Sequence, residues 1–576
     1  MTLIQAALNK IPADVHVKNV RVANVLTGEI YPADVIISGD QIAAVEPEET
    51  RPARQARRVL DGEGRLAVPG LIDSHLHIES SLVTPHAFAA AVLPRGTTTV
   101  AEDPHEIANA AGLEGVRQFL DSSRDLPLTI LFLASTCVPA ASGLEHCRGE
   151  LGAQEIAELL TWDGVIGLAE VMDARAVVDE EPRMSAILRE GRRRNAIIEG
   201  HNPMLEGREL QAYIAAGVDS DHTLADAQRL LQKIRLGVTV QLQERYMDGA
   251  LIAALNALPQ PLATLCLVTD DVAPDYLESH GHLDHVLRRA VALGMPPMEA
   301  LQAVTINPAR RLRLFDRGLI APGRRADLLL VDSLEAFNVS TTISGGHIVA
   351  REGSLHWQAP ARQNGLDTLR HSLDLSPVTA GDFLPDLPRT SGAVDVRVIV
   401  AHNQGTTTEE GRATIELVDG VPQLEQSDLS LIAVIARGNR SRAVGFLRGL
   451  GLQQGAIATS HAHDSHNLAI IGRDRQSMVT AANAVIEAGG GIGLAVGQDL
   501  IALVPLPLAG IISDEPLSVV AAQMRHFTRA IGDLGVRHPH LLMRLTTFTL
   551  PVSSGLRITD MGYVRARERA LVSLIV

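Results

Sequence analysis

The chain has 576 residues, which is more than one ordinary domain holds, so two to four domains are expected. Its formal net charge of −16 and its pI near 5.7 argue against nucleic acid or an anionic membrane as a partner. Hydrophobic residues make up 46% of the sequence, but no apolar run reaches membrane-spanning length. With three cysteines and no recognisable signal peptide, a cytoplasmic location is expected.

Apolar and polar residues alternate between about residues 15 and 68, with turn signals between the runs, which predicts short β-strands. Gly39 and Asp40 stand between two such runs and indicate a hairpin turn. Similar β patterns return from about residue 326 to residue 350. We therefore predict that residues 1–68 and 314–354 are the two parts of a β-sandwich domain that is split in sequence.

Between residues 69 and 313, short apolar strands alternate with helical stretches, which is typical of parallel β/α structure. The eight strand candidates are 66–74, 97–101, 129–135, 165–169, 195–199, 218–220, 239–242 and 264–268. Eight strands over this length predict a (β/α)8 barrel of the TIM type. A helix is expected from about 296 to 313. Residues 355–392 are expected to be a linker with short helices, and residues 393–576 a further α/β domain.

Histidines and carboxylates follow most of the predicted barrel strands. His75 and His77 end the first strand, and strand residues two apart point to the same side, so both can grip one divalent metal ion. A histidine after one strand is more often an ordinary loop residue, but polar groups at six strand ends of one barrel argue against that reading. The expected metal ligands are His75, His77, Glu170, His201, His222 and Asp270.

This ligand set can hold two divalent ions. The histidine pair and Asp270 would hold one ion, and His201 with His222 the other, with Glu170 as the bridge. Two close ions lower the pKa of a shared hydroxide. Asp270 can take the proton of that hydroxide and pass it to a leaving group. The pattern therefore predicts hydrolysis at a trigonal carbon.

The same pieces resemble the amidohydrolase superfamily over residues 15–350. The similarity includes segment 69–77, the histidine and aspartate positions after strands five, six and eight, and the closing segments 307–309 and 323–327. Together the order and the spacing are specific. They imply a metal-dependent hydrolase.

Many members of that superfamily bridge their metals with a carbamylated lysine on strand four. This chain departs from that pattern, because its only lysines are Lys10, Lys18 and Lys233 and none lies on that strand. We expect Glu170 to take the place of the lysine, with Glu102 as the alternative bridge.

Within the superfamily the chain is most similar to the adenine deaminases. The motifs that carry this similarity are 73–81, 102–109, 199–201, 219–222 and 269–271, and, beyond the barrel, 437–439 and 462–467. The similarity implies hydrolysis of adenine to hypoxanthine and ammonia in purine salvage or adenine catabolism, with two Mn(II) or Fe(II) ions. The implied mechanism is attack of a metal-bound hydroxide on C6 of adenine, while Asp270 carries a proton to the exocyclic amine.

Three further residues are candidates to hold the purine ring nitrogens: Glu79, His105 and Asp271. A second histidine cluster leaves three interpretations open, namely a further metal site, closure over the active site, or the packing of a loop. It consists of His461, His463 and His466. Because barrel hydrolases of this kind often form homo-oligomers, a dimer is expected.

Two other functions stay open from the sequence. One is a hydrolase of cyclic amides related to hydantoinases or dihydroorotases, although the missing lysine and the C-terminal domain weigh against it. The other is a barrel without catalysis that serves as a regulatory or assembly partner, against which the complete ligand set argues. Zinc deaminases with His-x-Glu and Pro-Cys-x-x-Cys are excluded, because Cys137, Cys147 and Cys266 form no such pair.

Overall fold

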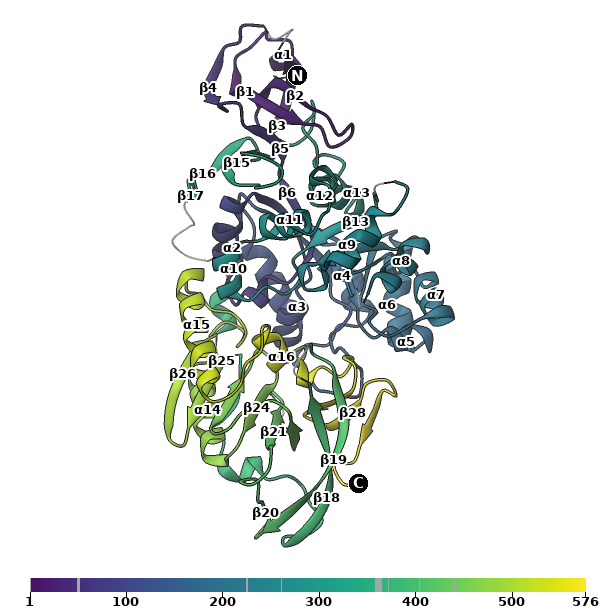
Figure 1. Ribbon diagram of the computed structural model, residues 1–576, viewed down its shortest axis with the longest axis vertical. Helices are drawn as coiled ribbons and strands as arrows, with labels where there is room; N and C mark the ends of the chain where they lie inside the picture. Colours follow the sequence, from purple (N-terminus) through teal and green to yellow (C-terminus); the bar gives the residue numbers. More distant parts are fainter. Residues whose placement is uncertain are drawn as a thin grey trace.

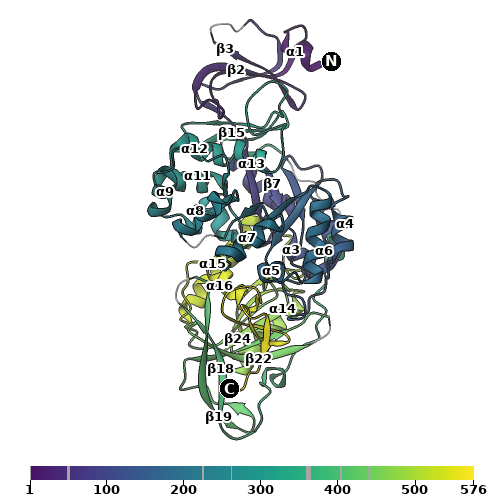
Figure 2. The ribbon, with the colours of Figure 1, turned by 90° about the vertical axis from the view of Figure 1, so that its right-hand side faces the viewer.

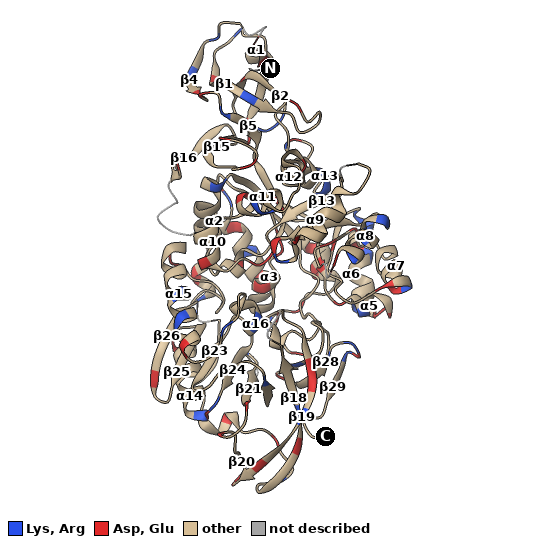
Figure 3. Ribbon diagram, viewed as in Figure 1, with Lys and Arg blue, Asp and Glu red and all other residues tan. Residues whose placement is uncertain are grey.

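The computed structural model describes residues 2–48, 52–223, 226–260, 262–357, 365–370, 372–402, 405–438 and 441–576. An N-terminal sheet lies at one end of an elongated molecule, a barrel in the middle and a C-terminal α/β part at the other end (Figure 1). Figure 2 shows the same order after a quarter turn. Acidic and basic residues are interspersed along the whole ribbon (Figure 3). In the described chain we find no helix that is both long and apolar enough to cross a membrane.

Two segments that are far apart in sequence form one nine-stranded sheet. The first segment supplies β1 (Ala13–Ala23), β2 (Ile30–Ser38), β3 (Gln41–Pro47), β4 (Ala56–Asp61) and β5 (Leu66–Pro69). The second supplies β14 (Leu328–Val331), β15 (Val339–Ser344), β16 (His347–Arg351) and β17 (Ser354–Leu355). They join where β14 pairs antiparallel with β5. The hairpin predicted at Gly39 and Asp40 is present between β2 and β3.

All eight predicted barrel strands are present, and they confirm a TIM-type core. They are β6 (Leu71–Leu76), β7 (Thr97–Glu102), β8 (Thr129–Ala134), β9 (Val165–Val171), β10 (Ile197–Gly200), β11 (Ser220–Asp221), β12 (Thr239–Gln243) and β13 (Leu265–Val268). β6 to β10 form one parallel sheet, and β11 to β13 form a second. The two sheets meet at two places. At one, the N–H of Asp219 donates a 3.1 Å hydrogen bond to the carbonyl of Ile198; at the other, Leu76 and Asp270 form a parallel β-bridge.

The helices of the middle part cover this barrel. They are α2 (Pro85–Val92), α3 (His105–Ser122), α4 (Ala153–Leu159), α5 (Ala174–Val178), α6 (Pro182–Arg193), α7 (Gly207–Ala215), α8 (Ala227–Arg235), α9 (Gly249–Asn256), α10 (Pro274–His280), α11 (Leu283–Ala292), α12 (Pro297–Ala303) and α13 (Ile306–Arg311). Their apolar residues recur at helical spacing. α11, for example, buries Leu283, Val286, Leu287 and Ala290 on one face. α1 (Thr2–Ala7) lies apart, beside the N-terminal sheet.

Two predicted elements were wrong in extent. The strand expected over 66–74 breaks at Gly70, because β5 pairs with β14 in the N-terminal sheet while β6 pairs with β7 in the barrel. The helix expected over 296–313 breaks between α12 and α13, because the Val304 carbonyl accepts a 2.8 Å hydrogen bond from the N–H of Ile72 in β6. Both breaks depend on contacts between distant parts of the chain.

The C-terminal part is an α/β unit built on a second nine-stranded sheet. Its strands are β18 (Gly392–Ala401), β19 (Thr408–Val418), β20 (Val421–Pro422), β21 (Leu429–Ile435), β22 (Arg442–Arg448), β23 (Ala456–Thr459), β24 (Leu468–Gly472), β25 (Gly491–Val496) and β26 (Asp499–Pro505). A small sheet of β27 (Leu556–Thr559), β28 (Gly562–Arg565) and β29 (Ala570–Val572) follows. The helices are α14 (Arg475–Glu487), α15 (Leu517–Asp533) and α16 (Leu541–Thr546).

The expected linker 355–392 contains two short 3₁₀ turns, Leu366–Leu369 and Ala380–Phe383. Positions 358–364 and 371 of this linker lie outside the described residues, as does Asn439 of the motif 437–439.

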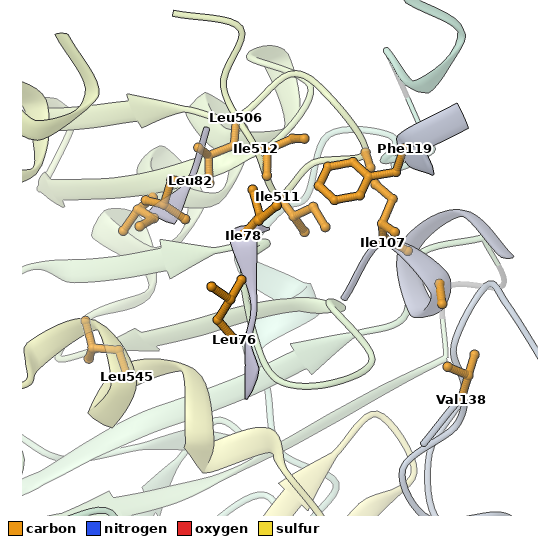
Figure 4. Close-up of a cluster of buried hydrophobic side chains, with 14 of the residues drawn as sticks. Leu76, Ile78, Leu82, Ile107, Phe119, Val138, Leu506, Ile511, Ile512 and Leu545 are labelled. Atoms are coloured by element: carbon orange, nitrogen blue, oxygen red, sulfur yellow. The ribbon is translucent and has the colours of Figure 1, made fainter. Parts of the chain in front are cut away.

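The barrel and the C-terminal part share one hydrophobic core. Figure 4 shows Ile511 and Ile512 beside Ile78 and Leu82, which follow strand β6. The chain also pairs across the boundary, since the N–H of Ser513 donates to the carbonyl of Leu82 at 2.8 Å. This packing fixes the C-terminal part over the barrel end from which the ligands project.

Candidate active site

All six predicted ligands meet at the carboxyl end of the barrel strands. His75 lies in β6 and His77 directly after it. Glu170 lies in β9, while His201, His222 and Asp270 follow β10, β11 and β13. Five of these side chains are at most 4% exposed, and that of His201 is 22% exposed. The barrel topology therefore assembles residues that are spread over almost 200 positions of the sequence.

Asp270 and the first histidine pair form one side of the cluster. Asp270 Oδ1 lies 3.5 Å from Nε2 of His75 and 3.3 Å from Nε2 of His77. The second oxygen, Oδ2, accepts a 2.7 Å hydrogen bond from Arg245. One carboxylate oxygen thus faces the histidines while the other is held by a guanidinium group.

Glu170 stands between the two groups of histidines. Its Oε2 lies 2.5 Å from Nδ1 of His201 and 3.2 Å from Nε2 of His222. Its Oε1 lies 3.5 Å from Nε2 of His77. Each oxygen of this carboxylate therefore faces a different half of the cluster.

The alternative bridge, Glu102, is turned away from these histidines. Its Oε2 accepts a 2.9 Å hydrogen bond from the N–H of Ile78, and its carboxyl lies beside that of Glu79. Burial and the charge of Glu79 raise the pKa of Glu102 well above its ordinary value. In the described part of the chain, neither Glu102 nor His201 belongs to a side-chain group that could hold a metal ion, but His201 contacts Glu170 whereas Glu102 does not face the cluster.

The donor set fits divalent transition-metal ions. His75, His77 and Asp270 form one group of potential ligands, and His75, Glu170 and His222 form a second that shares His75. Both ring nitrogens of His75 and Nδ1 of His222 are buried and make no hydrogen bond within the described chain. Buried polar atoms without a partner are costly, and imidazole with carboxylate suits Mn, Fe or Zn.

The buried carboxylates of the cluster also favour the binding of cations between them. Burial opposes charge on His75, yet the carboxylates of Asp270 and Glu199 raise its pKa to about 10. Burial likewise opposes ionisation of Asp270, but Arg245 together with His75 and His77 holds the pKa of Asp270 well below its ordinary value. Positive charge on protons or metal ions is therefore strongly favoured between these carboxylates.

Three residues that contact this cluster, Arg245, Asp103 and Asp464, were not predicted as site residues from the sequence. Arg245 follows strand β12 and holds Asp270. Asp103 forms a group of potential ligands with His77, Glu170 and His105, of which only Asp103 was not predicted. Asp464, from the C-terminal part, lies 3.7 Å from Nε2 of His105. The position of Arg245 after a barrel strand was the one signal available for it, whereas the approach of Asp464 depends on tertiary packing.

Two cavities adjoin the cluster. The larger, of about 1090 Å³, is lined by five of the predicted ligands and by His105 and Asp271. The smaller, of about 500 Å³, is lined by Ser80, Arg245 and Asp271 among others. Glu79 lines neither of them, since its Oε1 accepts from the N–H of Ile107. Of the predicted substrate contacts, His105 and Asp271 therefore line a cavity, whereas Glu79 lines neither cavity.

The loop 460–467 between β23 and β24 covers the barrel mouth. His463 lines both cavities, Asp464 lines the larger one, and His461 lines the smaller one. His538 and His540, which precede α16, also line both. The C-terminal part therefore closes the site from the side opposite the barrel strands.

Comparisons with known proteins agree with this architecture. Residues 66–349 match the model of the amidohydrolase family, and residues 405–570 match the adenine deaminase C-terminal domain. The barrel with its histidines and carboxylates thus defines a metal-dependent amidohydrolase.

Adenine deaminases of several bacteria match almost the whole chain. The Adenine deaminase 2 of Rhizobium meliloti (strain 1021) is 41% identical, over 97% of this chain and 94% of its own. The adenine deaminase of Klebsiella pneumoniae subsp. pneumoniae is 38% identical, over 100% of this chain and 95% of its own. The adenine deaminase of Moorella thermoacetica is 38% identical, over 100% of this chain and 97% of its own. The chain belongs to the adenine deaminase family.

Proposed function

We propose that this chain hydrolyses adenine to hypoxanthine and ammonia at the cluster around Glu170. The observation that carries the proposal is the placement of Glu170, whose two oxygens face His77 on one side and His201 with His222 on the other. A buried carboxylate in that position is suited to bridge two cations where a carbamylated lysine is missing.

Two divalent ions, Mn(II) or Fe(II), are the proposed cofactors. His75, His77 and Asp270 would hold one ion, and His201 with His222 the other. Ions bound there would supply Lewis-acid activation of water at neutral pH. Glu199 Oε2 lies 3.2 Å from Nδ1 of His75, which places a negative charge beside that ring.

Asp270 is the proposed proton carrier. Its Oδ2 is anchored by Arg245, so its Oδ1 is held toward the histidines in one orientation. Because its pKa is held well below the ordinary value, Asp270 is ionised before the reaction and can accept a proton from the attacking water. It then delivers that proton to the exocyclic amine of adenine, which leaves as ammonia.

The larger cavity is the proposed binding place of the purine. His105 and Asp271 line it and can hydrogen-bond ring nitrogens as donor and acceptor. Ser80 holds Asp271 in place with a 2.6 Å hydrogen bond. A contact of Glu79 with the substrate stays a prediction, as do the homodimer and the cytoplasmic location.

The proposal is tested by a substrate panel on protein purified with Mn(II). Ammonia release from adenine, with hypoxanthine as the product, is the expected result. Hydantoin and dihydroorotate serve as cyclic-amide controls and should not be opened. Ring opening of either, without ammonia release from adenine, would replace the deaminase by a cyclic-amide hydrolase on the same barrel.

A further inference from the structure

A second group of buried ligand-type side chains lies where the loop 460–467 meets the first turn of α3. Glu106 comes from α3, and His461 and His463 come from the loop. Their side chains are at most 7% exposed. They belong to none of the ligand sets assigned above, and the hydroxyl of Ser80 lies between Glu106 and Asp271, 2.8 Å and 2.6 Å from their oxygens.

The distances in this group suit ligands of one ion better than hydrogen bonds. Glu106 Oε2 lies 3.7 Å from Nδ1 of His461, and Glu106 Oε1 lies 3.9 Å from Nδ1 of His463. Ligand atoms that each stand about 2.1 Å from one ion are roughly 3–4 Å apart. Within the described chain, Glu106 Oε2 and His461 Nδ1 are buried and have no hydrogen-bond partner.

The charges around Glu106 also favour a cation. Burial raises the pKa of Glu106 to about 7; the charges of His463 and His105 oppose this rise, whereas the carboxylates of Glu79 and Asp271 add to it. The ion pairs of Glu106 that the described structure contains are both with histidines. A divalent ion bound here would neutralise the carboxylate of Glu106 and would also accept Nδ1 of His461 as a ligand.

We propose that Glu106, His461 and His463 bind a further divalent transition-metal ion, separate from the pair around Glu170. Two imidazoles and one carboxylate are a ligand set that Zn(II), Fe(II) and Mn(II) accept. The site takes one ligand from the barrel and two from the C-terminal part, so the ion ties the covering loop to the barrel mouth. This goes beyond the proposed deamination, in which the ion takes no part.

The test is a metal count on the full-length protein. The chain is stripped with a chelator, dialysed against Zn(II), and analysed by mass spectrometry of the metal per chain. Wild type should hold one ion more than His461→Gln and one more than Glu106→Gln, whose changes come from the two sides of the site. Equal zinc content in wild type and both variants would overturn the proposal.

His466→Gln is the matched control. Its ring lies 5.2 Å from that of His461 and is fully buried, but its nitrogens lie outside the ligand group. This variant should keep the wild-type count, and loss of an ion in it as well would overturn the ligand assignment. Circular dichroism shows whether each variant is folded, and if His461→Gln is not, Glu106→Gln decides the count. Ammonia release from adenine is measured in parallel, so failure of the deaminase proposal is seen separately.

Discussion

At the scale of single residues, Glu170 is the proposed bridge between two metal ions. Lys233, the one lysine near the barrel mouth, is engaged elsewhere: its Nζ donates to the carbonyls of Asn202 and Thr223 and pairs with Asp221 at 2.8 Å. No lysine is therefore free to become a bridging carbamate. The carboxylate of Glu170 supplies the same two oxygen donors without modification.

Glu170→Gln should lower metal content, because an amide offers one neutral oxygen in place of two charged ones. We expect a loss of metal affinity of more than about 10-fold, measured by titration of the stripped protein with Mn(II). Glu102→Gln is the matched control, since Glu102 faces Ile78 and Glu79 rather than the histidines. If Glu170→Gln bound Mn(II) as tightly as wild type and Glu102→Gln bound it more weakly, Glu102 rather than Glu170 would be the bridging ligand.

Much of the candidate site could be predicted from residues that follow strands. His201, His222 and Asp270 were predicted because parallel strands end on one face of a barrel, which is a property of the sequence pattern. Asp464 could not be placed in this way, because its approach to His105 depends on how two domains pack. Arg245 was missed for a different reason, since an arginine beside a carboxylate has no fixed spacing in sequence.

At the scale of elements, His282 connects a helix with two strands of the barrel. It precedes α11, and its Nδ1 lies 2.9 Å from the hydroxyl of Thr97 in β7. Its Nε2 lies 3.3 Å from the hydroxyl of Thr269, which follows β13. Burial lowers the pKa of His282 to about 3, so the ring is neutral in the folded protein.

This histidine should make stability fall in mild acid. The unfolded chain binds a proton at His282 below about pH 6.5, while the folded chain binds it only near pH 3, so lowering the pH favours unfolding. Between pH 7 and pH 5 the loss is about 2 kcal/mol. Urea unfolding of wild type and His282→Gln at both pH values measures it, and the variant should lose about 2 kcal/mol less. Identical pH dependence in the two proteins would contradict this reading.

The elements themselves were predictable where local pattern decides them. The eight barrel strands follow from short apolar runs in the sequence. The break at Gly70 could not be predicted, because it depends on the pairing of β5 with β14 from a distant part of the chain. The break after α12 likewise depends on a hydrogen bond from Ile72.

At the scale of the whole molecule, the candidate active site lies between the barrel and the C-terminal part. The barrel supplies the proposed ligands, and the C-terminal part supplies the covering loop and the residues before α16. Their relative position is held by apolar packing around Ile512 and by backbone contact between Ser513 and Leu82. Activity should therefore depend on residues far from the chemistry.

Ile512→Ala should weaken this junction. Removing a fully buried isoleucine leaves a cavity and destabilises a protein by about 2–5 kcal/mol. Because the cavity lies between the domains, ammonia release should fall at temperatures where circular dichroism shows the chain still folded. Ile415→Ala is the control, since Ile415 is buried in the separate core of the C-terminal part. A loss of activity in step with global unfolding in both variants would argue against the junction as the cause.

The most direct test of the account is ammonia release from adenine by the Mn(II)-loaded protein beside its Asp270→Asn variant. Asparagine keeps the size of the side chain but cannot accept and return a proton. We predict rapid release by wild type and a rate lower by about 10²–10⁴-fold in the variant. Release by Asp270→Asn at the wild-type rate would contradict the assigned role of Asp270, and no release by the metal-loaded wild type would contradict the proposed function.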